Sequence, residues 1–207
     1  RGTAALTRSA AALERQRAEH GQERAHPAGL HGGHREAQPG IIGRASAVEL
    51  ALMGANVTLM ARNEAALQQT LSVLDVSQGQ KHRYIVADFS KTENVKNAVD
   101  TYLAAFPEVH ILVNNTGGPA GGPIIDAAPD QFLKTFEMHL INNQLLAQAL
   151  IPAMKKAGFG RIVNIISTSV KQPIVGLGVS NTIRWSVASW AKTLSLEIGK
   201  FGITVNN

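Results

Sequence analysis

Three consecutive hydroxyl side chains, Ser167, Thr168 and Ser169, follow a short apolar run in the last quarter of the chain. The run, Ile162 to Ile166, is rich in β-branched residues, which is typical of a parallel strand buried on both faces. Open α/β sheets bind their ligands at the carboxyl ends of the strands. We therefore expect a ligand site at these hydroxyl groups.

A long helix is predicted directly after this site. Apolar residues recur at spacings of three and four between Ile183 and Ile198, and Gly199 marks the end of the pattern. Ile203 to Val205 then begins another buried strand. A strand, a polar turn and a long helix together predict one wall of a crevice.

A second candidate site lies where two glycines precede a helix, at Gly40 and Gly43. Glycines at such a junction let the backbone approach a pyrophosphate lying on the helix N-terminus. About 20 residues later the next predicted strand ends at Arg62, where dinucleotide folds contact the ribose. A cation with no carboxylate beside it favours the 2′-phosphate of NADP over NAD. The alternative is that Arg62 is a solvated surface arginine.

The elements that position these residues alternate regularly between strand and helix. Such alternation, with helices of ten to twenty residues, predicts βαβ units and a doubly wound parallel sheet of the Rossmann type. The predicted strands are 56–60, 84–86, 110–113, 162–166 and 203–205, and the predicted helices are 45–53, 63–76, 92–106, 136–156 and 183–198, with a further helix beginning at Pro129.

The composition changes abruptly near residue 39, which suggests two parts. Residues 1–38 contain six of the eleven arginines and four of the seven histidines, but no Val, Ile, Met, Phe, Tyr, Trp or Lys. Residues 4–24 could form a frayed surface helix with little to bury. We expect 1–38 to be disordered or non-native, an out-of-frame translation being one explanation and a targeting segment another. Residues 39–207 are expected to form an incomplete dinucleotide-binding domain.

Charge and composition exclude several classes of function. The formal net charge is +5, but the basic residues after position 40 are scattered among acidic ones, so we expect no nucleic-acid partner. No stretch approaches the ~20 apolar residues of a membrane span, so no membrane partner is expected. The absence of cysteine fits the reducing cytoplasm. The N-terminal histidines lack the spacing of a metal site, and no metal is expected.

Residues 40–207 resemble the short-chain dehydrogenase/reductase family, and especially the bacterial 3-oxoacyl-acyl-carrier-protein reductases. Several motifs carry the resemblance, in the order and spacing of the family: Gly43-Arg44-Ala45, Ala87-Asp88, Asn114-Asn115-Thr116-Gly117, Arg161-Ile162-Val163-Asn164-Ile165-Ile166-Ser167, Ala191-Lys192-Thr193-Leu194-Ser195-Leu196-Glu197 and Gly202-Ile203-Thr204-Val205-Asn206.

The resemblance implies a fold, a cofactor and an assembly. Asp88 is implied to contact the adenine of NADP, and Asn114, Asn115, Thr116 and Gly117 to steady the central strands beside the cofactor. Homodimers or homotetramers are implied. The chain departs from the family in two places: the first strand with its Gly-rich loop is not recognisable, and the last strand is missing. A missing first strand would expose the edges of its two neighbours in the sheet.

The resemblance also implies a catalytic tetrad, of which only the serine is unchanged. Carried across by position, the serine is Ser167. Ser180 and Arg184 occupy the positions of the tyrosine and lysine, and His139 occupies that of the asparagine.

These exchanges alter the acid–base chemistry. Ser180 is a far weaker acid than a phenol, and it is either a site residue or a helix N-cap. Arg184 keeps the positive charge and, like the lysine, could hold the nicotinamide ribose or stabilise an oxyanion, but it cannot relay protons. His139, with an unperturbed pKa near ~6.5, would either transfer a proton or be a satisfied helix histidine.

We therefore expect an NADP-dependent oxidoreductase that interconverts a carbonyl and an alcohol, with a 3-oxoacyl-type or related ketone as substrate. The alternative is a non-catalytic nucleotide-binding or interaction subunit that has lost the Tyr/Lys pair.

Overall fold

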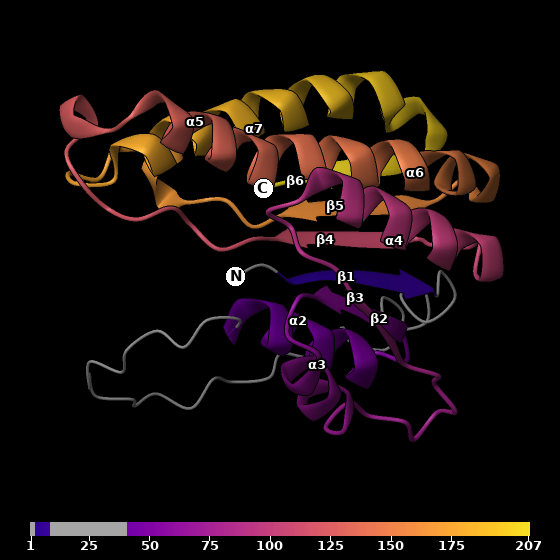
Figure 1. Ribbon diagram of the computed structural model, residues 1–207. Helices are drawn as coiled ribbons and strands as arrows, with labels where there is room; N and C mark the ends of the chain where they lie inside the picture. Colours follow the sequence, from indigo (N-terminus) through magenta and orange to yellow (C-terminus); the bar gives the residue numbers. More distant parts are fainter. Residues whose placement is uncertain (1–2, 9–40) are drawn as a thin grey trace, which may run out of the picture.

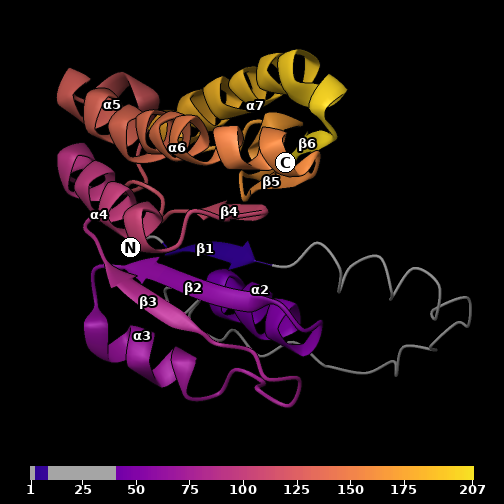
Figure 2. The same cartoon turned by 90° about the vertical axis from the view of Figure 1, so that its right-hand side faces the viewer.

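The computed structural model describes residues 3–8 and 41–207, which form one six-stranded sheet with helices on both faces (Figures 1 and 2). In chain order the elements are β1 (Thr3–Arg8), α2 (Ile41–Leu52), β2 (Asn56–Ala61), α3 (Glu64–Leu71), β3 (Arg83–Val86), α4 (Thr92–Ala105), β4 (Ile111–Asn115), η1 (Ile124–Asp126), α5 (Pro129–Phe136), η2 (Glu137–Ile141), α6 (Asn142–Ala157), β5 (Gly160–Asn164), η3 (Thr168–Val170), α7 (Gly178–Ile198), η4 (Gly199–Phe201) and β6 (Ile203–Asn206).

The strand order is β3-β2-β1-β4-β5-β6, the order of a doubly wound dinucleotide-binding sheet. Strand β2 runs parallel to β3, β4 to β5, and β5 to β6. The predicted Rossmann-like α/β fold is therefore confirmed.

The expectation for the first strand was wrong. Thr3–Arg8, predicted as part of a frayed helix, is strand β1 and lies between β2 and β4. It runs antiparallel to both neighbours, so Leu6 faces Thr58 on one side and Leu112 on the other. Without β1, two rows of backbone N–H and C=O groups would lack partners, and a short extended segment satisfies both rows. Residues 9–40 lie outside the described residues.

Apolar side chains pack on both faces of the sheet. On one face, β-strand residues such as Leu112 and Ile162 contact α4 and α6 through Val95 and Leu150. On the other face, α2 and α3 cover β2 through small and aliphatic residues, with Ala47 fully buried. Helix α7 lies beside α6, where Trp190 Nε1 donates a hydrogen bond to Gln144 Oε1 at 2.7 Å, and it also contacts β6. The two cores hold the strand ends at fixed positions.

The long helix predicted over 136–156 contains an irregularity. The helix winds as a π-helix over Glu137–Ile141 before α6 begins at Asn142. The Asn142 amide donates hydrogen bonds to Met138 O and to Phe89 O, at 3.2 and 2.7 Å. One-turn π segments recur at functional sites because they re-aim a side chain. Here the re-aimed segment contains His139.

Candidate functional site

The carboxyl ends of β4 and β5 lie side by side, and the chain leaves both strands at the same edge of the sheet (Figure 1). Asn114 of β4 pairs with Asn164 of β5, and Thr116 and Ile165 follow directly after. Helix α7 contacts both η2 and η3, so it brings its first turns to this edge. Backbone groups from two strands and side chains from α7 and η2 therefore converge.

Arg184 lies at the centre of this convergence. Its side chain is buried, with 8% of the residue exposed. Nη1 donates a hydrogen bond to Ile165 O at 3.0 Å, and Nη2 donates one to Thr116 O at 3.3 Å. Arg184 therefore ties α7 to the ends of both β4 and β5. Burial lowers its pKa, but an arginine remains protonated at neutral pH.

No carboxylate among the described residues forms an ion pair with Arg184. The ion pairs found in residues 3–8 and 41–207 are Lys96–Asp100 and Lys134–Asp130, both on exposed helix surfaces. The nitrogen Nε of Arg184 is buried and has no hydrogen-bond partner in this part of the chain. Among the described residues, the partners of this buried positive charge are backbone carbonyls.

His139 is the second buried polar group. The residue is 1% exposed, and its Nδ1 forms a hydrogen bond with Thr116 Oγ1. Nε2 is buried and unpaired among the described residues. Burial, together with the charge of Arg184, lowers the pKa of His139 to about 3. His139 is therefore neutral at pH 7 and cannot supply a proton as an imidazolium, contrary to the expectation from its unperturbed pKa.

The two candidate serines lie around this pair. Ser167 is half-buried, and its Oγ accepts a hydrogen bond from the Ser169 backbone N–H at 3.1 Å, which caps η3. Ser180 is half-buried in the first turn of α7, one helical turn before Arg184. Leu177, not Ser180, is the N-cap residue of α7, so the N-cap interpretation of Ser180 was wrong.

The Gly-rich segment is only partly within the described residues. Gly43 is buried in the first turn of α2, which begins at Ile41, four residues earlier than predicted. Gly40 lies outside the described residues. Because β1 is antiparallel, Thr3 and not Arg8 faces Asn115 at the site edge. The chain therefore does not pass directly from the end of β1 to the start of α2 as it does in a parallel βα unit.

Arg62 and Asp88 form a separate polar group after β2 and β3. Arg62 is exposed, and its charge lies close enough to Asp88 to help lower the pKa of that carboxyl. The largest cause of the lowered pKa is a hydrogen bond from the Ser90 backbone N–H to Asp88 Oδ1, at 3.0 Å. The neighbouring Asn63 caps α3 through its side chain. Arg62 is thus an exposed cation with an acidic neighbour across the loop.

Asn114 belongs to a chain of amides across the strand ends. Its Nδ2 donates to Asn164 Oδ1 at 2.9 Å, and Asn164 Nδ2 donates to Asn207 Oδ1 at 3.1 Å. These contacts link β4, β5 and the residue after β6. Asn115 and Gly117 are both half-buried where the chain leaves β4. The structure thus brings Ser167, Ser180, Arg184 and His139 to one edge, beside these amides.

The resemblance implied a supporting role for Thr116 beside the cofactor, but sequence reasoning did not predict its contacts with Arg184 and His139. The Thr116 carbonyl accepts from Arg184 and its hydroxyl contacts His139, so it joins the two buried groups. The only sequence signal was its place between Asn115 and Gly117 at a strand end. Trp185 also lies at this site: its Nε1 donates to Ser169 O at 3.2 Å, and half of the residue is exposed.

Two loops beside the site are fastened to each other. The Gly122 N–H donates to Gly176 O at 2.6 Å, and Gly122 forms a parallel bridge with Leu177. The Asn181 side chain donates to Ile174 O at 2.8 Å. The loop after β4 and the loop after β5 therefore have a fixed spacing on the outer side of α7.

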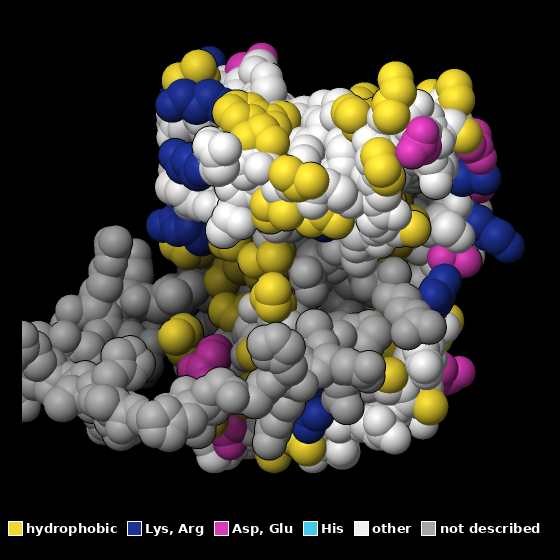
Figure 3. All heavy atoms as spheres, turned by 90° about the vertical axis from the view of Figure 1, so that its left-hand side faces the viewer, with side chains coloured by type: hydrophobic (Ala, Val, Ile, Leu, Met, Phe, Trp, Pro, Cys, Tyr) yellow, Lys and Arg dark blue, Asp and Glu magenta, His cyan; other side chains and the backbone are white. Residues whose placement is uncertain are grey.

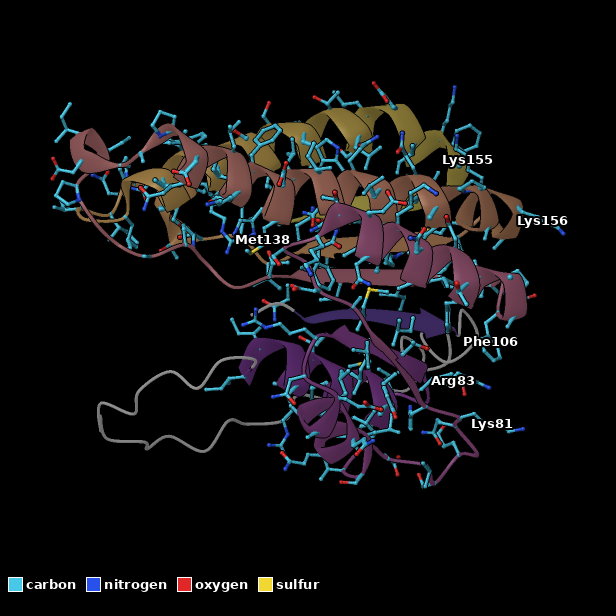
Figure 4. The ribbon with its side chains drawn as sticks, viewed as in Figure 1. Lys81, Arg83, Phe106, Met138, Lys155 and Lys156 are labelled. Atoms are coloured by element: carbon cyan, nitrogen blue, oxygen red, sulfur yellow. The ribbon has the colours of Figure 1, made fainter. Side chains whose placement is uncertain are left out.

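This end of the molecule exposes apolar side chains (Figure 3). Figure 3 shows them over the half that holds α5 and α7, and they come from both loops and both helices: Ile124, Ile125, Leu133, Ile174, Val175 and Trp185. The opposite end differs, because Lys155 and Lys156 project there from the last turn of α6, far from Met138 and the π segment (Figure 4). Basic side chains at that end are solvated, in contrast to Arg184.

Residues 3–8 and 41–207 contain neither a cluster of metal-binding side chains nor a membrane-spanning helix. Within these ranges no three His, Asp or Glu side chains gather closely enough to hold a metal ion. No helix there has the length and hydropathy needed to cross a membrane.

Comparisons with known proteins agree with this architecture. The family model described as short chain dehydrogenase matches residues 37–207. A Streptomyces coelicolor protein named as a ketoacyl reductase is 32% identical over 80% of this chain and 64% of its own length. The chain therefore spans slightly less than two thirds of the length of that relative.

Solved structures give the same result. L-sorbose reductase from Gluconobacter frateurii, in complex with NADPH and L-sorbose, superposes with a TM-score of 0.75 at 30% identity, covering 80% of this chain and 63% of its own. A xylitol dehydrogenase bound to NAD+ superposes with a TM-score of 0.72 at 25% identity, covering 80% of this chain and 64% of its own. The two neighbours bind different nicotinamide cofactors.

Proposed function

The chain belongs to the short-chain dehydrogenase family, and on that premise we propose that it interconverts a carbonyl and an alcohol with NADP(H) as its cofactor. The proposed substrate is a small molecule, a 3-oxoacyl-type or related ketone. The observation that supports this most is Arg184, a buried cation fixed between the ends of β4 and β5, where it donates to the carbonyl of Ile165, two residues before Ser167. A fixed positive charge at this edge of the sheet stabilises negative charge that develops on a carbonyl oxygen.

The residues after β2 and β3 fit a 2′-phosphorylated dinucleotide. Arg62 is exposed and free to pair with a phosphate, and the ionised Asp88 is held by Ser90 at the neighbouring strand end. Gly43 is buried in the first turn of α2, and the N-terminus of a helix is a favourable place for a pyrophosphate. When bound, NADP(H) donates or accepts a hydride.

The chain's own residues would then bind and polarise the substrate. The Ser167 hydroxyl donates a hydrogen bond to the carbonyl oxygen, and Arg184 stabilises the charge that grows there. His139 stays neutral and holds Thr116, whose carbonyl positions Arg184. Neither Ser180 nor His139 is an adequate acid near pH 7, so we propose that water delivers the proton.

The test is NADPH oxidation across a panel of ketones, measured for the unaltered chain, Arg184→Met and Ser167→Ala. Removing one preorganised oxyanion donor typically costs about 10²–10³ in kcat, and a loss of this order is expected from each variant. Unchanged turnover in Arg184→Met would remove that residue from the mechanism. NADPH binding by calorimetry, with no ketone turned over, would instead favour the non-catalytic nucleotide-binding alternative.

We also propose a cytoplasmic homodimer or homotetramer. Helices α6 and α7 lie side by side, and Leu196 of α7 is 74% exposed. Analytical ultracentrifugation of the unaltered chain and Leu196→Glu tests this, with a shift to monomer expected in the variant. A monomer in both would refute it.

A further inference from the structure

Buried polar atoms without partners are concentrated around the candidate site. Seven such side-chain atoms occur within the described residues, and six come from β4, η2, the start of α6, η3 and the first turns of α7. These six are Asn114 Oδ1, His139 Nε2, Asn142 Oδ1, Ser169 Oγ, Asn181 Oδ1 and Arg184 Nε. Buried polar atoms in folded proteins nearly always have partners, so a cluster of exceptions indicates a polar ligand or ordered water.

Arg184 shows what charge the ligand carries. Its guanidinium has five N–H donors, of which two donate to acceptors among the described residues, both of them neutral backbone carbonyls. No described carboxylate pairs with it. Buried charges are almost always paired, because an unpaired one loses its hydration without compensation. The missing partner is therefore an anion that arrives from outside this part of the chain.

The anion could be supplied by the cofactor phosphates or by the substrate, and the position of Arg184 distinguishes between these two sources. The dinucleotide phosphates would lie at the start of α2, which belongs to the helices on the face opposite α4 and α6. Arg184 belongs to α7, which lies beside α6 and reaches the ends of β4 and β5 (Figure 2). The substrate, not the cofactor phosphates, is the group expected between Arg184 and Ser167.

We infer that the substrate is an oxo acid, in which a carboxylate adjacent to the reacting carbonyl pairs with Arg184. This inference rests on the proposed function and narrows its substrate class. A 2-oxo or 3-oxo carboxylate presents carboxylate and keto oxygens on one edge, and a planar guanidinium with one further N–H on each of Nη1 and Nη2 can contact both. A lysine at the same position offers only a point charge. A neutral thioester would leave the buried cation without a counterion.

Matched pairs of substrates test the inference. The value of kcat/KM with NADPH is measured for pyruvate against methyl pyruvate, and for acetoacetate against methyl acetoacetate. A charge-assisted pair is worth about 1.5–3 kcal/mol, so at least one acid is expected to exceed its ester by about tenfold or more. In Arg184→Met, the kcat/KM of the acid divided by that of its ester is expected to fall to about one or below. In Arg184→Lys, this ratio is expected to take an intermediate value.

Arg161→Met is the matched control. Arg161 is also held by carbonyls, Gly160 O at 2.7 Å and Gly202 O at 3.0 Å, but it lies at the opposite end of β5. Its replacement should leave the acid-to-ester ratio unchanged. Esters that match or exceed both acids in the unaltered chain would overturn the inference while leaving carbonyl reduction intact, as would an unchanged ratio in Arg184→Met.

A binding measurement decides the inference if no ketone is reduced. The thermal midpoint is then measured with NADP+ and either lactate or 3-hydroxybutyrate, against their methyl esters, because a ligand that binds the native state raises the midpoint. A rise with an acid that is absent with its ester, and absent in Arg184→Met, supports an anion site. No rise with either acid overturns it.

Discussion

Arg184 and His139 share one neighbour, Thr116, and burial together with the charge of Arg184 determines the protonation of His139. The positive charge of Arg184 and the lack of solvent both favour the neutral imidazole. The imidazole in turn holds the Thr116 hydroxyl. A sequence cannot give this result, because an unburied histidine would titrate near neutral pH.

His139 gives a pH prediction for stability. Its pKa in the folded state is about 3, below the unfolded value of about 6.5, so the unfolded chain binds more protons between these values. The stability from neutral His139 is complete above about pH 6.5 and is lost as pH falls toward 3, by about 1.4 kcal/mol per pH unit within that window. Urea unfolding at pH 7, 6, 5 and 4 measures this.

His139→Asn serves as the comparison, because an amide does not titrate. Its free energy of unfolding should fall less steeply than that of the unaltered chain between pH 6 and 4. Parallel curves would mean that His139 is not held neutral by burial.

Arg62 gives a prediction for cofactor choice. Arg62→Asp places a carboxylate where the 2′-phosphate is proposed to lie, so NADPH binding should weaken by about tenfold or more while NADH binding is kept or improved. Dissociation constants from calorimetry measure the change. Lys156→Asp, at the far end of the molecule (Figure 4), is the control for net charge and should alter neither constant. An equal effect from both variants would place Arg62 outside the cofactor site.

At the scale of elements, the spacing of the loops after β4 and β5 depends on one close contact, between Gly178 and Ile124. A Cβ added at Gly178 would lie 2.4 Å from the Ile124 Cβ and 2.7 Å from its Cα, too close without displacing the η1 backbone. Gly178→Ala should therefore lower the free energy of unfolding by about 1–3 kcal/mol and disturb the site at the start of α7. Urea unfolding and KM for the best ketone measure the two effects.

Gly199→Ala is the matched control for this substitution. A Cβ at Gly199 meets no atom within 4 Å, and its φ is −55°. That change should be neutral, or stabilising by about 0.5–1 kcal/mol. If Gly178→Ala were as well tolerated as Gly199→Ala, the two loops would not be rigidly spaced.

Most elements follow from hydrophobic periodicity, and the exceptions have physical reasons. The β-branched runs before Ser167 and Asn114 predict buried strands, and β4 and β5 lie there. The π segment at His139 could not be predicted from local periodicity. The residue that follows it, Asn142, donates a hydrogen bond to Phe89 O, 53 residues away in sequence. The contacts of Thr116 with Arg184 and His139 could not be predicted for the same reason, because they depend on α7 and η2 meeting beyond β4.

At the scale of the whole molecule, the sheet is continuous because β1 fills its centre. The apolar pattern of residues 3–8 is weak, so sequence reasoning did not find a strand there. The antiparallel direction of β1 is set by its backbone pairing, which no side-chain pattern encodes. The two halves of the sheet, β2 with β3 and β4 with β5 and β6, are joined through β1.

Ala5→Pro tests whether β1 joins the two halves. Ala5 lies opposite Leu59 and Val113, and proline removes an N–H from the ladder, with a cost of about 3 kcal/mol or more in a central strand. Amide hydrogen exchange should become faster in β2 and β4, while β6, which does not contact β1, should change least. Unchanged exchange in β2 and β4 would show that β1 does not stabilise them.

Transfer of a hydride from the nicotinamide to a carbonyl carbon tests the central claim most directly. The chain is incubated with NADPH deuterated at C4 and with each ketone or oxo acid, and the product alcohol is analysed by mass spectrometry. The account predicts one deuterium on the carbinol carbon, and a rate reduced about 10²-fold or more in Arg184→Met. If NADPH binds but no carbonyl substrate yields a deuterated alcohol, the account is contradicted.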